Sequence, residues 1–238
     1  MPPDLPDLPS VFDPVIALRE AGDAMARATE LAPQHGAGTL AWVRSFSRIE
    51  AAVVLEPEQP LAAARPALLA ALGALADALG AYGPPEIPVT FSWPATLLVS
   101  GAEAGRARLA WPPGTAEDAV PDWLVVGIEA RLSFPRGWAP GLGLGQTALR
   151  EEGWLEEEAS GADLTAAWAR HLMAGLAEWQ QAGPHGGFRR LAERYLARLA
   201  AEPWMGEGRR GLDPATGDLL LDQGGDRRRH PLLDAVAA

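Results

Sequence analysis

Hydrophobic positions recur along the chain with two different spacings, and these spacings predict the order of helices and strands. Residues 15–31 carry apolar or small side chains three and four positions apart, which predicts a first helix. Residues 39–43 and 51–55 are short apolar runs separated by a segment of hairpin length, so we expect two neighbouring strands. Residues 61–79 place leucines on one stripe with alanine between them, which is typical of a helix packed on a sheet.

The middle of the chain, residues 89–111, has the residue preferences of β-strands. Val, Thr, Phe and Leu favour a pleated surface, and the residue before the proline of Trp93-Pro94 is pushed into an extended conformation. This stretch therefore predicts strand, corner, strand, glycine turn and strand. Residues 123–132 begin with a continuous apolar run, which indicates a strand covered on both faces, and helical stripes follow at 164–179 and 188–199. The predicted fold class is α+β, a mixed β-sheet flanked by helices.

The two ends of the chain differ from this middle part. Residues 1–12 are rich in proline and acidic residues and predict an extended N-terminal arm without the basic region of a secretory signal. Residues 209–222 contain two short extended runs joined by an Asp-Pro-Ala-Thr-Gly turn, which predicts a small β unit. We therefore expect the arm over residues 1–12, a main domain over 13–201 and a small C-terminal β unit over 202–238.

Composition excludes several classes of function. The net charge of −11 is unfavourable for nucleic-acid binding, which requires clustered positive charge. The chain has no cysteine, so disulfides, thiolate metal sites and cysteine nucleophiles are absent. It also has no lysine and no asparagine, and all 20 basic residues are arginines. Lysine cannot act here as a nucleophile or proton carrier, and arginine is a poor substitute because it stays charged.

Other signals for membranes, metals and anions are weak. Arg65 and Asp77 interrupt the most apolar stretch, so we expect no membrane span and a cytoplasmic protein. The four histidines lack metal-ligand spacing, and no metal site is predicted. The glycine-rich residues 137–145 are interpreted as a mobile loop rather than a phosphate cradle. Residues 227–229, three arginines, are interpreted as an exposed basic turn, with contact to an anion or an acidic carrier domain as the alternative.

Several short motifs, taken in order, resemble those of the biotin/lipoate protein ligase family. Trp93-Pro94 is similar to the Trp-Pro of the family's KWPND motif, and Gly38-Thr39, which a predicted strand follows, is similar to the family's Gly-Thr strand start. The other similar segments are Val53-Val-Leu-Glu-Pro57, Val126-Gly-Ile-Glu-Ala130, residues 146–151, and the Gly-Leu-Asp and Gly-Asp-Leu-Leu of the tail. The resemblance implies a biotin/lipoate ligase-like, class II synthetase-like fold with a small C-terminal unit, in a divergent member with degraded motifs.

The departures from the family pattern fall on the residues of the chemistry. The family's loop rich in glycine and arginine is represented only by Arg44 and Arg48. The Asn-Asp pair after Trp-Pro is replaced by Ala-Thr, and the family's catalytic lysine falls at Glu103, or at Arg106 if the turn is aligned differently. Glu103 would repel a carboxylate or phosphate, whereas Arg106 would stabilise charge without moving a proton.

The resemblance implies a ligand and a set of candidate binding residues around one cleft. The ligand is a small carboxylate or acyl compound, or an acyl-carrier or biotinyl domain. The predicted ligand-binding residues are Arg44, Arg48, Trp93, Arg106, Arg108 and Trp111. Trp93 and Trp111 would form the floor of the acyl pocket, and the alternative is that both belong to the core.

Three functional hypotheses follow. The first is a catalytically degenerate, ligase-like binding protein without a cofactor. The second is an active ATP-dependent ligase or acyltransferase in which arginines stabilise phosphate, and it would require ATP and Mg²⁺. The third is a protein-interaction module that uses an apolar sheet face for a partner or a homodimer.

Overall fold

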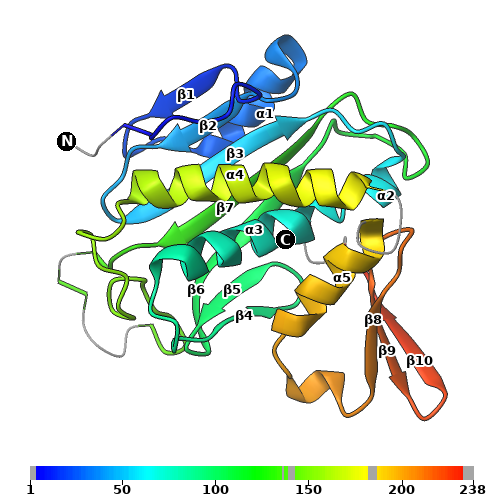
Figure 1. Cartoon of the computed structure of the whole chain (residues 1–238). Helices are drawn as coiled ribbons and strands as arrows, with labels where there is room; N and C mark the ends of the chain where they lie inside the picture. The colour runs from blue at the N-terminus through cyan, green and yellow to red at the C-terminus, as the bar shows by residue number, and fades with distance from the viewer. Residues whose placement is uncertain (1–3, 136, 139–142, 182–186, 233–238) are drawn as a thin grey trace.

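The main domain is built on one twisted sheet. The computed structural model describes residues 4–135, 137–138, 143–181 and 187–232. Seven strands lie in the order β1-β2-β3-β7-β6-β5-β4, with β1 parallel to β2 and every other pair antiparallel (Figure 1). The strands are β1 (Val15–Leu18), β2 (Leu40–Val43), β3 (Arg48–Leu55), β4 (Val89–Ser92), β5 (Thr96–Val99), β6 (Ala102–Ala110) and β7 (Leu124–Arg131). The predicted mixed sheet flanked by helices is confirmed.

The stretch at 89–111 forms the strands that its pattern predicts. β4 and β5 flank the Trp93-Pro94 corner, where the peptide bond is cis, and Ser100-Gly101 forms the turn into β6. Both turn residues have positive φ, 51° and 80° respectively, which explains the glycine at the second position. This part of the prediction depends only on local residue preferences, and it is confirmed.

The prediction of one helix over residues 15–31 is wrong at its beginning. Val15–Leu18 is the edge strand β1, and helix α1 runs from Ala24 to His35. Asp23 caps the helix by accepting a hydrogen bond from the Ala26 N–H at 2.8 Å. A short apolar run fits both the spacing of a helix and the alternation of a strand. Pairing with β2 makes this run a strand.

The predicted helix over residues 61–79 is divided in two. α2 (Leu61–Ala64) ends at Arg65, and α3 (Ala67–Tyr82) starts after Pro66, the place where proline is tolerated. The stretch Leu61–Tyr82 is long and apolar enough to cross a membrane, but 78% of its most apolar window is buried inside the fold. It is therefore the central core helix of the domain, while a cytoplasmic location stays a prediction.

The sheet has different covers on its two faces. α3 and α4 (Gly161–Gln180) run side by side across one face, together with α5 (Gly187–Arg198) (Figure 1). Trp154 and Trp168 each donate an indole N–H to a carbonyl of α3, at 3.0 and 3.1 Å. The opposite face carries α1, which packs on the sheet through Ala24, Met25 and Ala28. Hereafter these are called the α3-side face and the α1-side face.

The C-terminal β unit is confirmed as a second, small sheet. It consists of β8 (Arg209–Leu212), β9 (Leu219–Gln223) and β10 (Asp226–His230), preceded by a short 3-10 helix at Pro203–Met205. Leu212, Leu219 and Leu221 join the core of the main domain, so the unit is packed on that domain. The bounds predicted for the three segments of the chain stay predictions.

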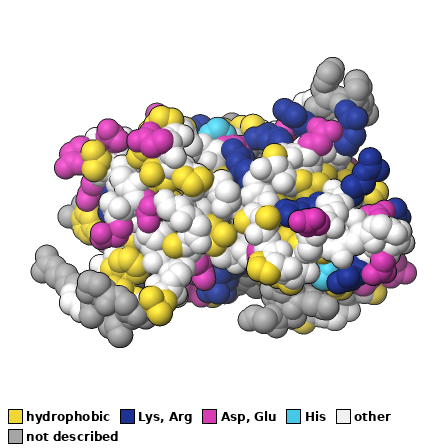
Figure 2. Space-filling view, turned by 90° about the horizontal axis from the view of Figure 1, so that it is seen from below, with side chains coloured by type: hydrophobic (Ala, Val, Ile, Leu, Met, Phe, Trp, Pro, Cys, Tyr) yellow, Lys and Arg dark blue, Asp and Glu magenta, His cyan; other side chains and the backbone are white. Residues whose placement is uncertain are grey.

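The interpretation of residues 227–229 as a basic turn is wrong, because these arginines lie within the edge strand β10. The glycines that precede β10, Gly224 and Gly225, form the turn instead, with φ of 62° and 96°. Figure 2 shows arginine side chains gathered at the end of the molecule that carries this unit, whereas acidic side chains gather at the other end.

Asp218 ties β10 to the end of the described chain. Its carboxylate accepts hydrogen bonds from Arg229 Nε at 2.6 Å and from the Leu232 N–H at 2.9 Å, and the residue is 7% exposed. Burial opposes the charged form, but these hydrogen bonds outweigh burial and hold the pKa of Asp218 below its ordinary value.

We expect Asp218→Asn to lower the free energy of unfolding at pH 7 by about 1–3 kcal/mol, since it weakens hydrogen bonds to a charged group. The pKa of Asp218 is lower in the folded state than in the unfolded state. Its contribution to the free energy of unfolding is therefore complete above the unfolded-state pKa of about 3.9 and is lost as the pH falls through the folded-state pKa. Urea unfolding between pH 2.5 and 7 measures this difference, which should narrow at the acidic end. Asp226→Asn, at an exposed residue of β10, is the control and should have little effect.

Candidate functional site

The α1-side face carries the charged side chains of the sheet. Along β3, β7 and β6, apolar residues that belong to the α3-side core alternate with Glu50, Glu129, Arg131, Arg106 and Arg108. Because successive side chains of a strand point to opposite faces, these five lie on the α1-side face. The arrangement forms a polar floor beside the first turn of α1.

A β-bulge places both positions considered for the family lysine on this floor. β5 pairs Leu97 with Gly105 but Leu98 with Glu103, so one extra residue is inserted in β6. Leu98 lies between two core residues of the α3-side face, so its partner Glu103 faces the α1 side. Arg106 lies opposite Glu129 and faces the same side. Without the bulge, two residues three positions apart would point to opposite faces.

Arg106 and Arg108 are held loosely. Arg106 Nη2 is 3.4 Å from a Glu129 carboxylate oxygen, and Arg108 Nη1 is 3.8 Å from Asp23. The Arg106 and Arg108 side chains are 58% and 39% exposed. Such long, exposed ion pairs contribute little to stability. Both guanidinium groups are therefore free to exchange their carboxylate partners for a ligand.

Arg48 has a different environment on the same face. Its Nε contacts Glu50 at 2.7 Å, and its Nη2 donates to the carbonyls of Glu20 and Gly22 at 2.8 and 3.0 Å. Glu50 in turn accepts a hydrogen bond from the buried Ala24 N–H at 2.7 Å. Arg48 and Glu50 thus fix the entry into α1 on the sheet, and the donors of Arg48 are occupied.

Arg44 faces the other side of the sheet. It lies two positions after Trp42, whose ring is 5.9 Å from the guanidinium carbon, and it is ion-paired with Asp4 of the N-terminal arm. Trp42 belongs to the α3-side core. Arg44 therefore anchors the arm, and the sheet separates it from Arg106.

The two tryptophans also lie on the α3-side face. Trp93 packs edge-on against Tyr195 of α5 with ring centroids 6.0 Å apart, and both Trp93 and Trp111 pack against the large core cluster. Burial raises the pKa of Tyr195 well above its ordinary value, with a smaller contribution from Glu202, so its neutral hydroxyl donates to the Pro94 carbonyl at 2.7 Å. The Trp-Pro corner is thus a packing element between the sheet and α5.

The structure therefore divides the predicted binding residues between two faces and does not place them around one cleft. Arg48, Arg106 and Arg108 lie on the α1-side face, together with Glu103, whereas Arg44, Trp93 and Trp111 lie on the α3-side face. The physical reason is that successive side chains of a strand point to opposite faces of the sheet, and the order of motifs along the sequence does not show which face each residue occupies. A ligand-binding role for each residue stays a prediction.

Sequence reasoning missed Glu50 and Arg131 as neighbours of this floor. Arg131 donates to the carbonyl of Thr147 at 2.7 Å and lies over the Phe134 ring at 5.2 Å. It thereby holds the segment after β7 beside Glu103. A signal for both residues was available, because each is a charged side chain at an alternate position within an apolar strand. The glycine-rich loop predicted at 137–145 lies partly outside the described residues.

No metal centre is formed in the part of the chain that the structure describes, where no group of three or more His, Asp or Glu side chains could hold an ion. Arg106 and Arg108 are the groups of the floor that an anion could contact, although Glu50, Glu103 and Glu129 lie on the same face. The possible chemistry of the two arginines is charge stabilisation, because arginine retains its proton.

The comparisons with known proteins agree with this fold. The model of the biotin/lipoate A/B protein ligase family matches residues 8–197. A biotin protein ligase-like protein of unknown function from Silicibacter sp. TM1040 is 28% identical, with a TM-score of 0.80 over 97% of this chain and 98% of its own.

Two biotin protein ligases with bound ligands are similar in fold. The enzyme from Aquifex aeolicus in complex with biotin and ATP is 16% identical, with a TM-score of 0.65 over 92% of this chain and 95% of its own. The enzyme from Leishmania major in complex with biotinyl-5-AMP is 14% identical, with a TM-score of 0.55 over 91% and 98%. No match is found among curated proteins.

We expect Glu50→Ala to lower the free energy of unfolding by about 1–3 kcal/mol, because it leaves the buried Ala24 N–H without an acceptor. Urea denaturation measures the change, and amide hydrogen exchange should show faster exchange at the start of α1. Glu129→Ala removes an exposed carboxylate from the same face and serves as the control, with an expected change of less than about 1 kcal/mol. Equal losses in the two variants would contradict the anchoring role of Glu50.

Proposed function

We propose a binding function for this chain, which belongs to the biotin/lipoate A/B protein ligase family. In this proposal it is a catalytically degenerate, ligase-like protein that binds a small carboxylate or acyl ligand on the α1-side face. The observation that carries the proposal is the loose pairing of Arg106 and Arg108 on the polar floor, where Glu103 and Arg106 occupy the two positions considered for the family lysine.

The side chains of the floor are suited to binding rather than to proton transfer. An ionised Glu103 accepts hydrogen bonds but cannot neutralise a phosphate, and Arg106 keeps its proton. Arg48, a remnant of the arginine-rich loop in the family pattern, uses its donors to fix the start of α1. The chain has no lysine that could replace them.

Arg106 and Arg108 are the residues proposed to hold the ligand. They lie two positions apart on β6, and their present carboxylate partners are 3.4 and 3.8 Å away. A ligand carboxylate that forms two parallel hydrogen bonds with a guanidinium group would make a stronger contact than these pairs. Leu98 on the adjacent strand supplies an apolar neighbour for the acyl part.

An active enzyme is the alternative hypothesis. The relative from Aquifex aeolicus has been solved in complex with biotin and ATP. For this chain, an ATP-dependent reaction would require ATP and Mg²⁺, with Arg106 and Arg108 stabilising phosphate charge. A carrier or biotinyl domain as the bound partner, a homodimer and a pure interaction module belong to the same set of proposals.

We expect calorimetric titration with biotin, lipoate and octanoate to show binding of at least one of them. Arg106→Ala should weaken that binding by about tenfold or more, because a hydrogen bond to a charged group contributes about 1.5–3 kcal/mol. Arg227→Ala, at an exposed arginine of the C-terminal β unit, is the control and should bind like the unmodified protein.

The same samples, mixed with ATP and Mg²⁺, should release no pyrophosphate. Release with repeated turnover would contradict catalytic degeneracy and establish the enzyme alternative. Absence of binding to all three acids would contradict the ligand proposal and favour the interaction module.

A further inference from the structure

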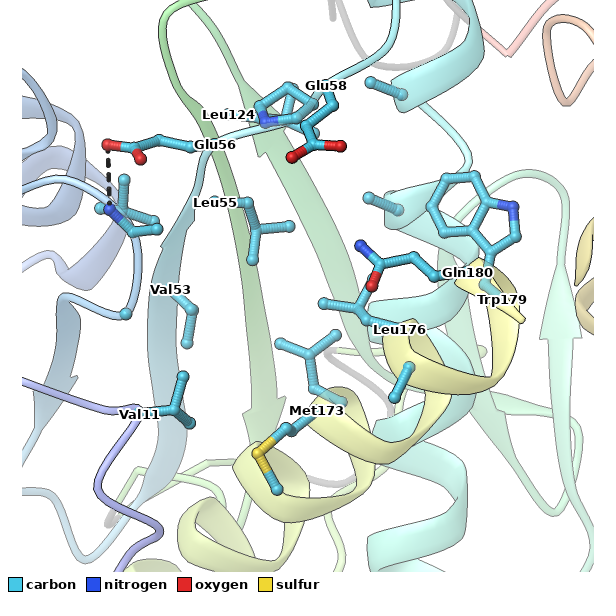
Figure 3. Close-up of a pocket in the computed structure, with 18 of the residues that line it drawn as sticks. Val11, Val53, Leu55, Glu56, Glu58, Leu124, Met173, Leu176, Trp179 and Gln180 are labelled. Atoms are coloured by element: carbon cyan, nitrogen blue, oxygen red, sulfur yellow. Dashed lines mark hydrogen bonds between the residues drawn. The ribbon is translucent and has the colours of Figure 1, made fainter. Parts of the chain in front are cut away.

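A large cavity lies on the other face of the sheet from Arg106. It has a volume of about 830 Å³ and lies between the end of β3, the N-terminal arm and the second half of α4 (Figure 3). Cavities that hold small organic ligands have volumes of about 300–1,000 Å³. None of the arginines of the polar floor lines it, so it is a separate space.

The cavity exists because α4 stops covering the sheet halfway along its length. The buried residues of α4 end at Leu172, although the apolar side chains continue with Met173, Leu176 and Trp179. These side chains face Val53 and Leu55 of β3 across the cavity (Figure 3). From Leu172 to Gln180 this helical wall is about 12 Å long at a rise of about 1.5 Å per residue. The walls therefore fit an elongated apolar group.

One end of the cavity is polar and acidic. Glu58 and Gln180 lie there, and Figure 3 shows the Glu58 carboxylate above Leu55 and Gln180, with the Glu56 carboxylate turned away from them. Glu56 accepts a hydrogen bond from the Ala37 N–H at 3.3 Å. The described lining residues include these two carboxylates and no Arg or His. Among described residues, neither Glu56 nor Glu58 forms a salt bridge.

We propose that this cavity binds a small organic cation with an apolar body, such as an alkylammonium or arylalkylammonium compound. The apolar body lies between β3 and α4, and the cationic head lies at Glu58 and Gln180. Burial of the body supplies the main driving force, and the Glu58 carboxylate, which has no salt bridge among the described residues, selects the charge of the head. Trp179 lines the same end, and an indole ring attracts organic cations.

Three probes with the same tail test the proposal on the full chain: octylammonium, octan-1-ol and octanoate. Calorimetry should show one octylammonium bound per chain, with the alcohol weaker and the carboxylate weakest at this site. Hydrogen exchange should slow in the last two turns of α4 when octylammonium is added. Equal affinity for ammonium and alcohol would overturn the proposal, as would protection confined to β6.

Matched variants separate this cavity from the polar floor and from the general acidity of the protein. Glu58→Gln should weaken octylammonium binding by about tenfold, the scale of one charge-assisted contact. Leu176→Arg places a positive charge in the apolar wall and should abolish binding. Glu157→Gln, outside the lining, and Arg106→Ala, on the other face, should change nothing. An equal loss in Glu157→Gln would show unspecific attraction to the net charge and overturn the proposal.

Glu58 is an exposed residue, so Glu58→Gln is expected to fold normally and keeps the test decisive even if Leu176→Arg is unstable. The proposed function is judged by the acids and by Arg106→Ala. Failure of the cation site and failure of the acyl site are therefore distinguishable.

Discussion

The alternation of side chains along β3, β7 and β6 is the constraint on which the rest of the structure depends. Val53 and Val54 are neighbours in sequence, yet the first packs under α4 and the second under α1. The same alternation sends Ile128 into the α3-side core and Glu129 to the polar floor. Each residue of the central strands is therefore committed to one of two environments. A shift of one residue in strand register would exchange the core with the charged face.

Four arginines of the α1-side face fall into two groups according to the acceptors of their hydrogen bonds and ion pairs. Arg48 and Arg131 donate to backbone carbonyls at 2.7–3.0 Å and hold loops against the sheet. Among the residues that the structure describes, Arg106 and Arg108 form polar contacts only with carboxylates, at 3.4 and 3.8 Å. A planar guanidinium with several donors suits the first role, because it satisfies more than one carbonyl at once. In a protein without lysine, the number of arginines alone says little about ligand binding, whereas their acceptors distinguish scaffold from candidate site.

Local patterns predict much of the fold but little of the site. The strands of residues 89–111 were predictable because residue preference, a proline corner and a glycine turn agree. The strand Val15–Leu18 was not predictable, since four residues fit both helical spacing and strand alternation, and only pairing with β2 decides between the two. The site depends on a bulge near Gly105 and on which face each arginine occupies. Both are properties of strand pairing, which motif order alone does not contain.

The exposed position of Glu103 and Arg106 means that packing places little constraint on the residue type at these two positions. Neither side chain contributes to the core, and within the described part of the chain Arg106 forms one long ion pair, so substitutions at these positions cost little stability. The Trp-Pro corner is different, because Trp93 and the Pro94 carbonyl both contact the buried Tyr195. Loss of that corner would open a cavity between the sheet and α5. Packing therefore constrains the Trp-Pro motif, whereas it places little constraint on Glu103 and Arg106.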